Sequence, residues 1–275
     1  KVNDDVVWWR ANFCSLTYAR VDSGGMQLRR TNSDVLSGGA SQGNVISDCT
    51  FTQNVGASYV TLLQGAYENR FTRCRFFGTT TGATFDAMRG RYLFRSPNNT
   101  FTDCLLSIEA WGATNGEQQA HGLRDSSRFN VFTRDTMLLG MTSKAARRAL
   151  LSQSGSVPAS SDYNAWIDCY YRSYATLDGS SNAAFEFQDD ADRVIVQGCQ
   201  FISRTGVPLA ISGNAQADSM VMRHCTFYTG GSQIYRYESG TNVTTARFNG
   251  NAYVGRSVGS CASNATAAYR LETLG

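Results

Sequence analysis

The densest group of carboxylates in the 275-residue chain lies between positions 186 and 192 and contains Glu186, Asp189, Asp190 and Asp192. A glycosidase works with two carboxyl groups, about 5–5.5 Å apart when it retains configuration and about 6.5–9.5 Å apart when it inverts. We predict Glu186, Asp189 and Asp190 as catalytic carboxylates of a polysaccharide hydrolase. Asp86 and Asp125 are further candidates for the same face. The alternative is that these acids are solvated turn formers.

The predicted substrate-binding residues are Trp111, His121, Arg124 and Arg236. A tryptophan ring offers an apolar face for a sugar ring, and polar side chains beside it hydrogen-bond the hydroxyls. Trp111 and His121 belong to a long insertion at 107–128 that also holds Glu109 and Glu117. The alternative for Trp111 is ordinary packing.

Other kinds of site are missing from the sequence. It has no phosphate loop, no dinucleotide fingerprint and no Ser-His-Asp elbow, so we predict no cofactor. It also has no CxxC, and His121 and His224 are not spaced for zinc, so we predict no metal site. A net charge of +3 is too small to indicate a nucleic-acid partner. The sequence contains no run of 18 apolar residues, so we predict no membrane span.

The elements that must position these residues read as short β-strands. Apolar, β-branched and aromatic runs alternate with Gly, Asn, Asp and Ser, which is typical of an all-β protein. The most helix-compatible stretch is 143–152. Four runs are expected to be strands that present outward side chains, at 58–65, 184–190, 208–214 and 234–240. If Phe185 and Phe187 face inward, Glu186 faces outward, two coils from Arg236 on the same face.

An eight-residue frame, first seen as NVISDCTF at 44–51, recurs along the chain. The frame position of Cys49 falls at 49, 74, 104, 135, 169, 199, 225 and 251, and it is cysteine in six of the eight copies, with Asp135 and Asn251 as the exceptions. A variable period around a fixed core predicts a solenoid in which each copy is one coil.

The frame also predicts how each coil bends. The position of Ile46 is always apolar and that of Phe51 is always large. Side chains alternate between the two faces of a strand, so positions 46 and 51 both face inward only if the chain bends between them. We place the bend at the Asp48 position, in a left-handed backbone conformation, although two copies carry arginine there.

This pattern resembles the pectate-lyase-like right-handed parallel β-helix superfamily, of the bacteriophage tailspike and polysaccharide depolymerase kind. The resemblance implies a single-stranded parallel β-helix over 44–253, with an irregular N-terminal coil and cap over 1–43 and a C-terminal cap or tail over 254–275. In that family an inward asparagine often fills the bend position and stacks as a ladder. Asn251 would retain it, and the cysteines would replace it.

Eight cysteines allow disulfides, a metal site or a nucleophile, but we predict a buried stack of free thiols. Stacked coils place the cysteine side chains parallel to one another, which is poor disulfide geometry. A column of reduced thiols favours assembly in a host cytoplasm over export, and therefore a virion protein over a secreted enzyme.

The sequence and the resemblance together predict a tailspike-like protein that binds a host surface polysaccharide. They leave open whether it is an enzyme, and if it cleaves the polymer, hydrolysis is favoured over elimination. The expected assembly is a homotrimer attached to other virion tail proteins. One alternative is a non-catalytic virion or surface β-helix. Another is a secreted lyase, although the ordered arginine and acidic motifs of lyases on this fold are missing. The N-terminus lacks an initiator Met, so we expect a piece of a longer chain.

Overall fold

The structure is a computed structural model. It describes residues 6–29, 41–53, 59–80, 89–110, 119–124, 127–141, 148–153, 162–174, 183–190, 193–204, 207–216, 220–230, 235–237, 246–254 and 270–271. In this part of the chain every regular element is a strand. No helix that could span a membrane is found among these residues.

The strands form three parallel sheets, named here by their first strand. Sheet 1 has nine strands: β1 (Val6–Trp9), β4 (Met26–Arg29), β7 (Tyr59–Gln64), β10 (Arg89–Phe94), β13 (Gln119–Arg124), β16 (Arg148–Gln153), β19 (Ala183–Asp190), β22 (Val207–Gln216) and β25 (Tyr235–Tyr237).

Sheet 2 has ten short strands: β2 (Ser15–Thr17), β5 (Val45–Ser47), β8 (Arg70–Thr72), β11 (Thr100–Thr102), β14 (Val131–Thr133), β17 (Ala165–Ile167), β20 (Ile195–Gln197), β23 (Met220–Arg223), β26 (Ala246–Asn249) and β28 (Arg270–Leu271). Sheet 3 has nine: β3 (Arg20–Asp22), β6 (Thr50–Gln53), β9 (Arg75–Thr80), β12 (Leu105–Ala110), β15 (Thr136–Met141), β18 (Tyr170–Ser173), β21 (Gln200–Ser203), β24 (Thr226–Thr229) and β27 (Ala252–Val254).

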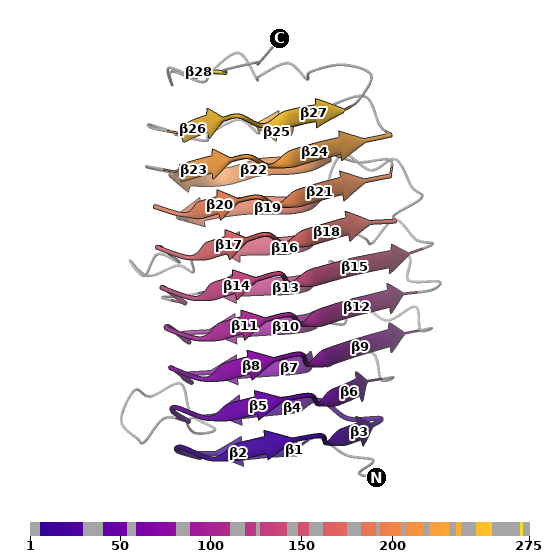
Figure 1. The fold of residues 1–275 in the computed structure, drawn as a ribbon, viewed down its shortest axis with the longest axis vertical. Helices are drawn as coiled ribbons and strands as arrows, with labels where there is room; N and C mark the ends of the chain where they lie inside the picture. Colours follow the sequence, from indigo (N-terminus) through magenta and orange to yellow (C-terminus); the bar gives the residue numbers. More distant parts are fainter. Residues whose placement is uncertain are drawn as a thin grey trace.

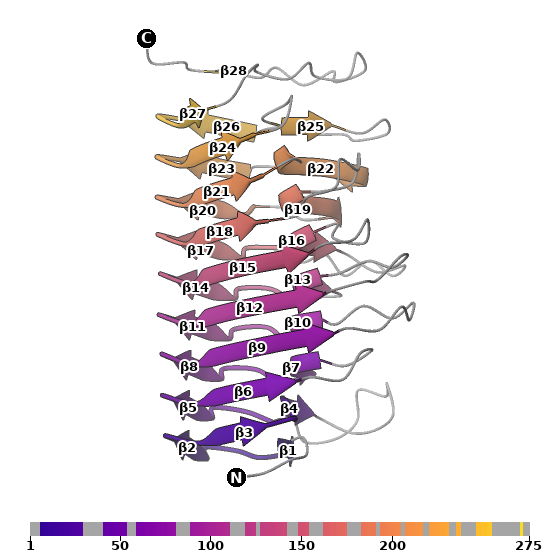
Figure 2. The ribbon, with the colours of Figure 1, turned by 90° about the vertical axis from the view of Figure 1, so that its right-hand side faces the viewer.

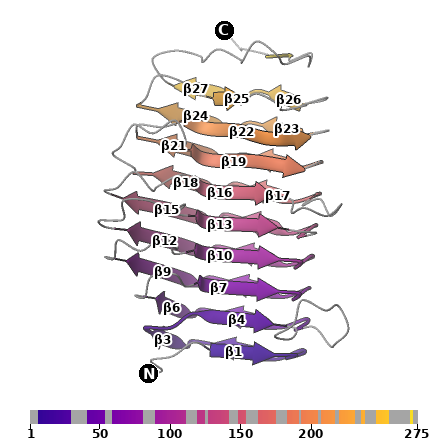
Figure 3. The same cartoon turned by 180° about the vertical axis from the view of Figure 1, so that it is seen from behind.

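Each coil runs from sheet 1 to sheet 2 to sheet 3, and the next coil stacks on it (Figure 1). Sheets 2 and 3 meet along the front, and sheet 1 closes the rear, where its strands run in the opposite sense (Figure 3). The path winds as a right-handed solenoid, so the predicted parallel β-helix is confirmed. The regular sheets also include β1 to β4, which lie N-terminal to residue 44.

The predicted inward residues form the core. The described side chains at the Ile46 position and at the Phe51 position are all buried. Because the coils are in register, equivalent rings stack on one another: Phe71 lies 4.5 Å from Phe101, and Phe101 lies 5.4 Å from Phe132, between ring centroids. Stacked rings gain dispersion energy beyond their burial, so the column stabilises each coil on the next.

The predicted bend is also confirmed, because every copy of the Asp48 position has a positive φ, from 49° at Arg134 to 65° at Gly198. The two arginines at this position have a specific partner. Arg73 contacts Asp48 in the preceding coil through two hydrogen bonds of 2.7 and 2.8 Å, and Arg134 does the same to Asp103. This pairing lowers the pKa of Asp48.

The asparagine ladder lies at a different bend from the one predicted. It runs along the first residue of the frame, one turn earlier in each coil, through Asn44, Asn69, Asn99, Asn130 and Asn164. Each side-chain amide donates to the amide oxygen of the next, at 2.8 to 3.2 Å. The same oxygens accept backbone N–H groups, which would otherwise be buried without partners. Asn251 is buried in the cysteine column, as expected.

An ion pair joins two adjacent coils in the core. Arg91 of β10 and Asp135, which replaces cysteine in the column, are both fully buried and joined by two hydrogen bonds. The Arg91 guanidinium carbon also lies 4.2 Å from the Phe101 ring and 4.8 Å from the Phe132 ring. Desolvation raises the pKa of Asp135, and the neighbouring Arg91 opposes that shift.

Candidate functional site

Sheet 1 brings the predicted carboxylate Glu186 into line with Arg236. Glu186 pairs with Ala210 on the next strand, and Ala210 pairs with Arg236 on the one after. Phe185 and Leu209, which precede Glu186 and Ala210, are buried. Strand alternation therefore puts the Glu186 row on the outer face, with Glu186 and Arg236 roughly 10 Å apart between Cα atoms. The register shows that Glu186 and Arg236 occupy equivalent strand positions two coils apart.

Arg124 belongs to the neighbouring row of the same face. It pairs with Gln153, which pairs with Gln188, two residues after Glu186. Arg124 therefore lies two coils before β19, while Arg236 lies two coils after it. The register places one predicted carboxylate between two predicted arginine ligands, along the direction in which the coils stack (Figure 3).

The other two carboxylates lie at an irregularity. Gln188 pairs with Ser212 but Asp190 pairs with Gln216, so the register between β19 and β22 shifts around Asp189. The extra residues are on β22, because Ser212 and Gln216 are four positions apart whereas Gln188 and Asp190 are two. Asp189 and Asp190 therefore lie opposite a bulge, a feature found often beside active sites.

Two of the predicted binding residues are not joined to this group. His121 pairs with Arg91, which pairs with Thr61, and both Arg91 and Thr61 are fully buried. His121 therefore occupies a register position in the inward row. Trp111 lies outside the described residues, as do Asp86, Glu117, Asp125 and Asp192.

The outer row of Glu186 is not open along its whole length. Its members in the earlier coils, Gln27, Leu62 and Tyr92, are 8%, 5% and 6% exposed. The N-terminal part of this face is therefore covered. A site on the face is restricted to the later coils, which are the coils that carry Glu186 and Arg236.

Sheet 3 has a second polar and aromatic surface, which the sequence reasoning missed. Tyr170 and Arg172 alternate with inward residues on β18, Tyr174 directly follows the strand, and the Arg172 guanidinium carbon lies 4.3 Å from the Tyr174 ring. Hydrogen bonding to Tyr170 raises the pKa of Arg172. The sequence YYRSY at 170–174 carries the signal for this surface, but the repeated frame identifies only Tyr171 in it, as a core residue.

An exposed acid lies near this cluster. Glu109 of β12 pairs with Gly140 of β15, and the strand after β15 brings Tyr174 to the same row, where its N–H donates to Leu139 O at 2.7 Å. Because Gly140 has no side chain, nothing stands between Glu109 and Tyr174 in the row. The outer face of sheet 3 therefore presents a carboxylate, a short gap and an arginine flanked by tyrosines.

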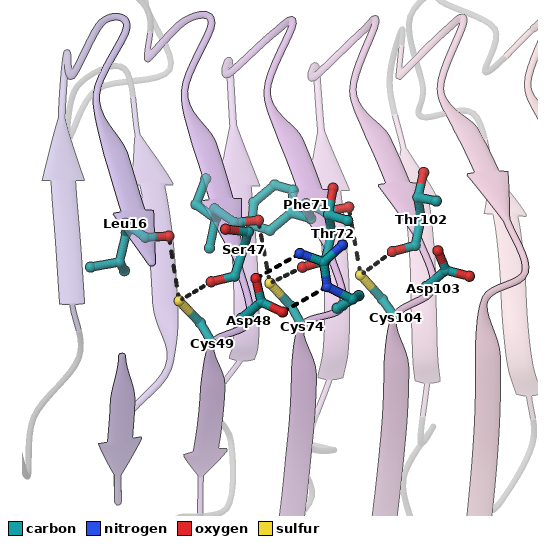
Figure 4. Close-up of polar contacts among 12 residues, drawn as sticks. Leu16, Ser47, Asp48, Cys49, Phe71, Thr72, Cys74, Thr102, Asp103 and Cys104 are labelled. Atoms are coloured by element: carbon teal, nitrogen blue, oxygen red, sulfur yellow. Dashed lines mark hydrogen bonds and ion pairs between the residues drawn. The ribbon is translucent and has the colours of Figure 1, made fainter. Parts of the chain in front are cut away.

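The cysteines of the column are buried and unpaired by disulfides. Six buried cysteines and the exposed Cys14 are free, and the described residues contain no cluster of three His, Cys, Asp or Glu side chains that would hold a metal. Each buried thiol donates to backbone carbonyls, as Cys49 does to Ser47 O at 3.1 Å (Figure 4). The predicted stack of buried free thiols is confirmed.

Burial of this column predicts its reactivity. In the native protein we expect a thiol reagent to label Cys14 and to leave Cys49, Cys74, Cys104, Cys169, Cys199 and Cys225 unmodified until the chain unfolds, because the reagent cannot reach them. Peptide mapping by mass spectrometry after brief labelling measures this. Rapid native labelling of any of the six would contradict the closed core, and a C14S variant provides the control.

No protein-family model matches the chain, and a search of curated proteins finds no relative. Solved structures do match. The enzymatically active domain of tailspike protein 2 from bacteriophage CBA120 is 11% identical over 90% of this chain and 42% of its own, with a TM-score of 0.45. An alginate lyase from Paenibacillus sp. is 11% identical over 95% of this chain and 91% of its own, also at 0.45.

The tailspike protein of Escherichia coli bacteriophage HK620, in a mutant form, is 8% identical over 85% of this chain and 59% of its own, with a TM-score of 0.42. The chain is a right-handed parallel β-helix. It spans 42% and 59% of the length of the two tailspikes. At these identities the likeness concerns the fold of the β-helix alone.

Proposed function

We propose that this β-helix binds a host surface polysaccharide and cleaves it by glycoside hydrolysis on the outer face of sheet 1. The observation that carries the proposal is the register of Glu186, Ala210 and Arg236 on one outward row, with Arg124 in the adjacent row. Rows of outward side chains along stacked coils suit an extended polymer, and arginine forks suit its charged or hydroxyl-rich groups.

The spacing along β19 favours inversion. Glu186 and Asp190 are four residues apart, about 13 Å between Cα atoms in an extended strand. A Cα separation of this size suits the 6.5–9.5 Å between the carboxyl groups of inverting enzymes better than the roughly 5 Å of retaining ones. We assign this pair as acid and base, with Asp189 as the neighbouring carboxylate.

Arg124 and Arg236 are the proposed binding residues, and Trp111 and His121 keep the roles predicted from the sequence. We place the protein in a virion tail, as a homotrimer beside other tail proteins, after assembly in the host cytoplasm. The free state of all seven described cysteines supports assembly under reducing conditions.

A second candidate function is polysaccharide binding without cleavage, which the outer face of sheet 3 favours. Arg172 is held between two tyrosines there, and Glu109 lies across the gap at Gly140. This arrangement can hold a sugar, but its described residues offer one carboxylate, whereas hydrolysis needs two. A secreted lyase is the third alternative.

Arg236→Ala separates the two faces. On the sheet 1 proposal, it weakens binding of the polysaccharide that the wild type cleaves about 10-fold or more, because a hydrogen bond to a charged group contributes about 1.5–3 kcal/mol. The matched variant Tyr174→Ala leaves binding and cleavage unchanged. Titration calorimetry with purified host capsule or lipopolysaccharide measures both. Loss of binding in Tyr174→Ala alone would move the site to sheet 3.

A further inference from the structure

An exposed stack of three side chains lies at the corner between sheets 1 and 2, which runs along the left edge of Figure 1. Phe129, Tyr163 and Arg193 occupy the same corner position in three successive coils, and the coils stack directly on one another (Figure 2). The rings of Phe129 and Tyr163 are face to face, with centroids 4.8 Å apart and planes at 13°. The Arg193 guanidinium carbon lies 5.1 Å from the Tyr163 ring, and Arg193 Nη1 donates to the Tyr163 hydroxyl. The rings are therefore held in one orientation.

The corner position is an unfavourable place for aromatic residues. Its backbone is left-handed, with a φ of 56° at both Phe129 and Tyr163, a conformation that bulky residues rarely adopt. Two earlier coils have Gly43 and Asn98 there, residue types that tolerate it. The rings also bury little, because Phe129 is 49% exposed and Tyr163 is 40% exposed. Strain and exposed apolar surface at one position both cost stability, which points to a binding role for the rings.

One face of the Phe129 ring is open. Tyr163 in the following coil covers the other face, and Phe129 contacts no further ring among the described residues. In the preceding coil the corner holds the exposed residue Asn98, and in the coil before that it holds Glu68, which accepts a hydrogen bond from Gln42 at 3.0 Å. Phe129 and Glu68 are two coil spacings apart, roughly 10 Å between Cα atoms. A ring that stacks on Phe129 lies in this interval, outside the short side chain of Asn98.

The stack lies beside the proposed site on sheet 1. Phe129 follows the strand of Arg124 in the same coil, and Arg193 follows the strand of Glu186 and Asp190 two coils later. Asp190 and Arg193 are three residues apart, at most about 11 Å between Cα atoms, and Arg124 and Phe129 are five residues apart, at most about 18 Å. A polymer that runs obliquely across sheet 1 therefore reaches the open face of Phe129 at one end of the site.

We propose that Phe129 and Tyr163 form a platform that binds one neutral pyranose ring of the polysaccharide, outside the catalytic group on sheet 1. The apolar face of the sugar packs on the open face of Phe129, and its hydroxyls face Asn98 and Glu68. Glu68 at the rim repels a sugar that carries a carboxylate, so the platform selects an uncharged unit. This assignment rests on the proposed function, since the ligand is the polymer that sheet 1 binds.

The test removes the ring and keeps the backbone conformation. Phe129→Asn gives this corner the residue type of Asn98, so we expect the variant to fold with a stability close to that of wild type. In a Glu186→Gln parent, which does not cleave the polymer, it should bind purified host capsule or lipopolysaccharide about 5-fold more weakly, the factor that corresponds to about 1 kcal/mol for an aromatic contact. Titration calorimetry measures the affinity. The control is Phe13→Asn, the same substitution at the exposed corner position of the first coil, four coils away, which keeps the parent affinity.

Circular dichroism and thermal unfolding establish that each variant is folded. Tyr163→Asn removes the ring that supports Phe129 and should weaken binding as well, so the test does not depend on one variant. Parent affinity in either variant, when folded, overturns the platform and leaves the proposed function standing. Equal weakening in Phe13→Asn also overturns it, because any exposed ring would then have the same effect. A parent that binds no host polysaccharide contradicts the proposed function and the platform together.

Discussion

Replacing Glu186 by Gln is expected to reduce the rate of polysaccharide cleavage about 10²–10⁴-fold while leaving polysaccharide binding within about 2-fold of wild type. The amide keeps the size of the side chain but neither gives nor takes a proton, so a general acid–base step is lost. The proposed binding residues Arg236 and Arg124 are untouched, and they lie on separate coils. The measurement is the initial rate of release of reducing ends, with binding followed in parallel.

Gln188→Glu is a useful companion to this variant, because Gln188 lies two residues along β19 in the row of Arg124. This substitution adds a carboxylate to the same strand, and we expect that this carboxylate does not take over the role of Glu186. Full activity in Glu186→Gln would remove Glu186 from the chemistry. Equal loss of binding and rate would make it a binding residue instead.

Replacing Asp135 by Asn is expected to lower the free energy of unfolding by about 3–5 kcal/mol, the largest effect on stability that we predict. Arg91 would remain fully buried between Phe101 and Phe132 without a counter-charge. Chemical denaturation followed by circular dichroism measures the change. Asp103→Asn is the control, because its partner Arg134 is exposed and a surface pair contributes little.

The double variant Arg91→Leu with Asp135→Cys should recover wild-type stability or exceed it. It restores the cysteine of the neighbouring coils and replaces a buried ion pair by apolar groups, a change that is often neutral or stabilising. A double variant less stable than Asp135→Asn would show that the pair contributes more than it costs to bury.

The free energy of unfolding of the single variant Arg91→Leu should depend on pH. Burial then raises the pKa of Asp135 without opposition from Arg91, so the folded state prefers the protonated acid. Stability is fully present below the ordinary pKa of 3.8 and is lost as the pH rises through the raised value. A free energy of unfolding that is flat from acid to neutral pH would contradict this.

The repeat made the fold predictable, because one frame predicted the core, the bend and the stacking direction. Ile46, Cys49 and Phe51 are buried as expected, and Asp48 has the left-handed backbone. The asparagine ladder was misplaced although Asn44 opens the quoted frame. The family pattern directed attention to the cysteine position, while hydrogen bonds between amides of successive coils leave no periodicity along a single coil.

The site was less predictable, because it depends on contacts between coils. The register of Glu186 with Arg236 can be counted within well-aligned strands, so the sequence was enough to predict their separation of two coils. The Arg91–Asp135 pair joins residues 44 positions apart in adjacent coils, and Asp135 stood out only as an exception in the cysteine column. Tyr174 was missed because it follows the frame, at the end of a strand whose length varies between coils.

The most direct test of hydrolysis on this β-helix is the mass of the products released from a host surface polysaccharide. We expect oligosaccharides of whole repeat units plus one water, with the anomeric configuration of the new reducing end inverted. Products that lack this water and absorb near 235 nm, a wavelength typical of unsaturated uronates, would identify a lyase and contradict the account. So would an intact polymer after incubation with every capsule and lipopolysaccharide that the protein binds.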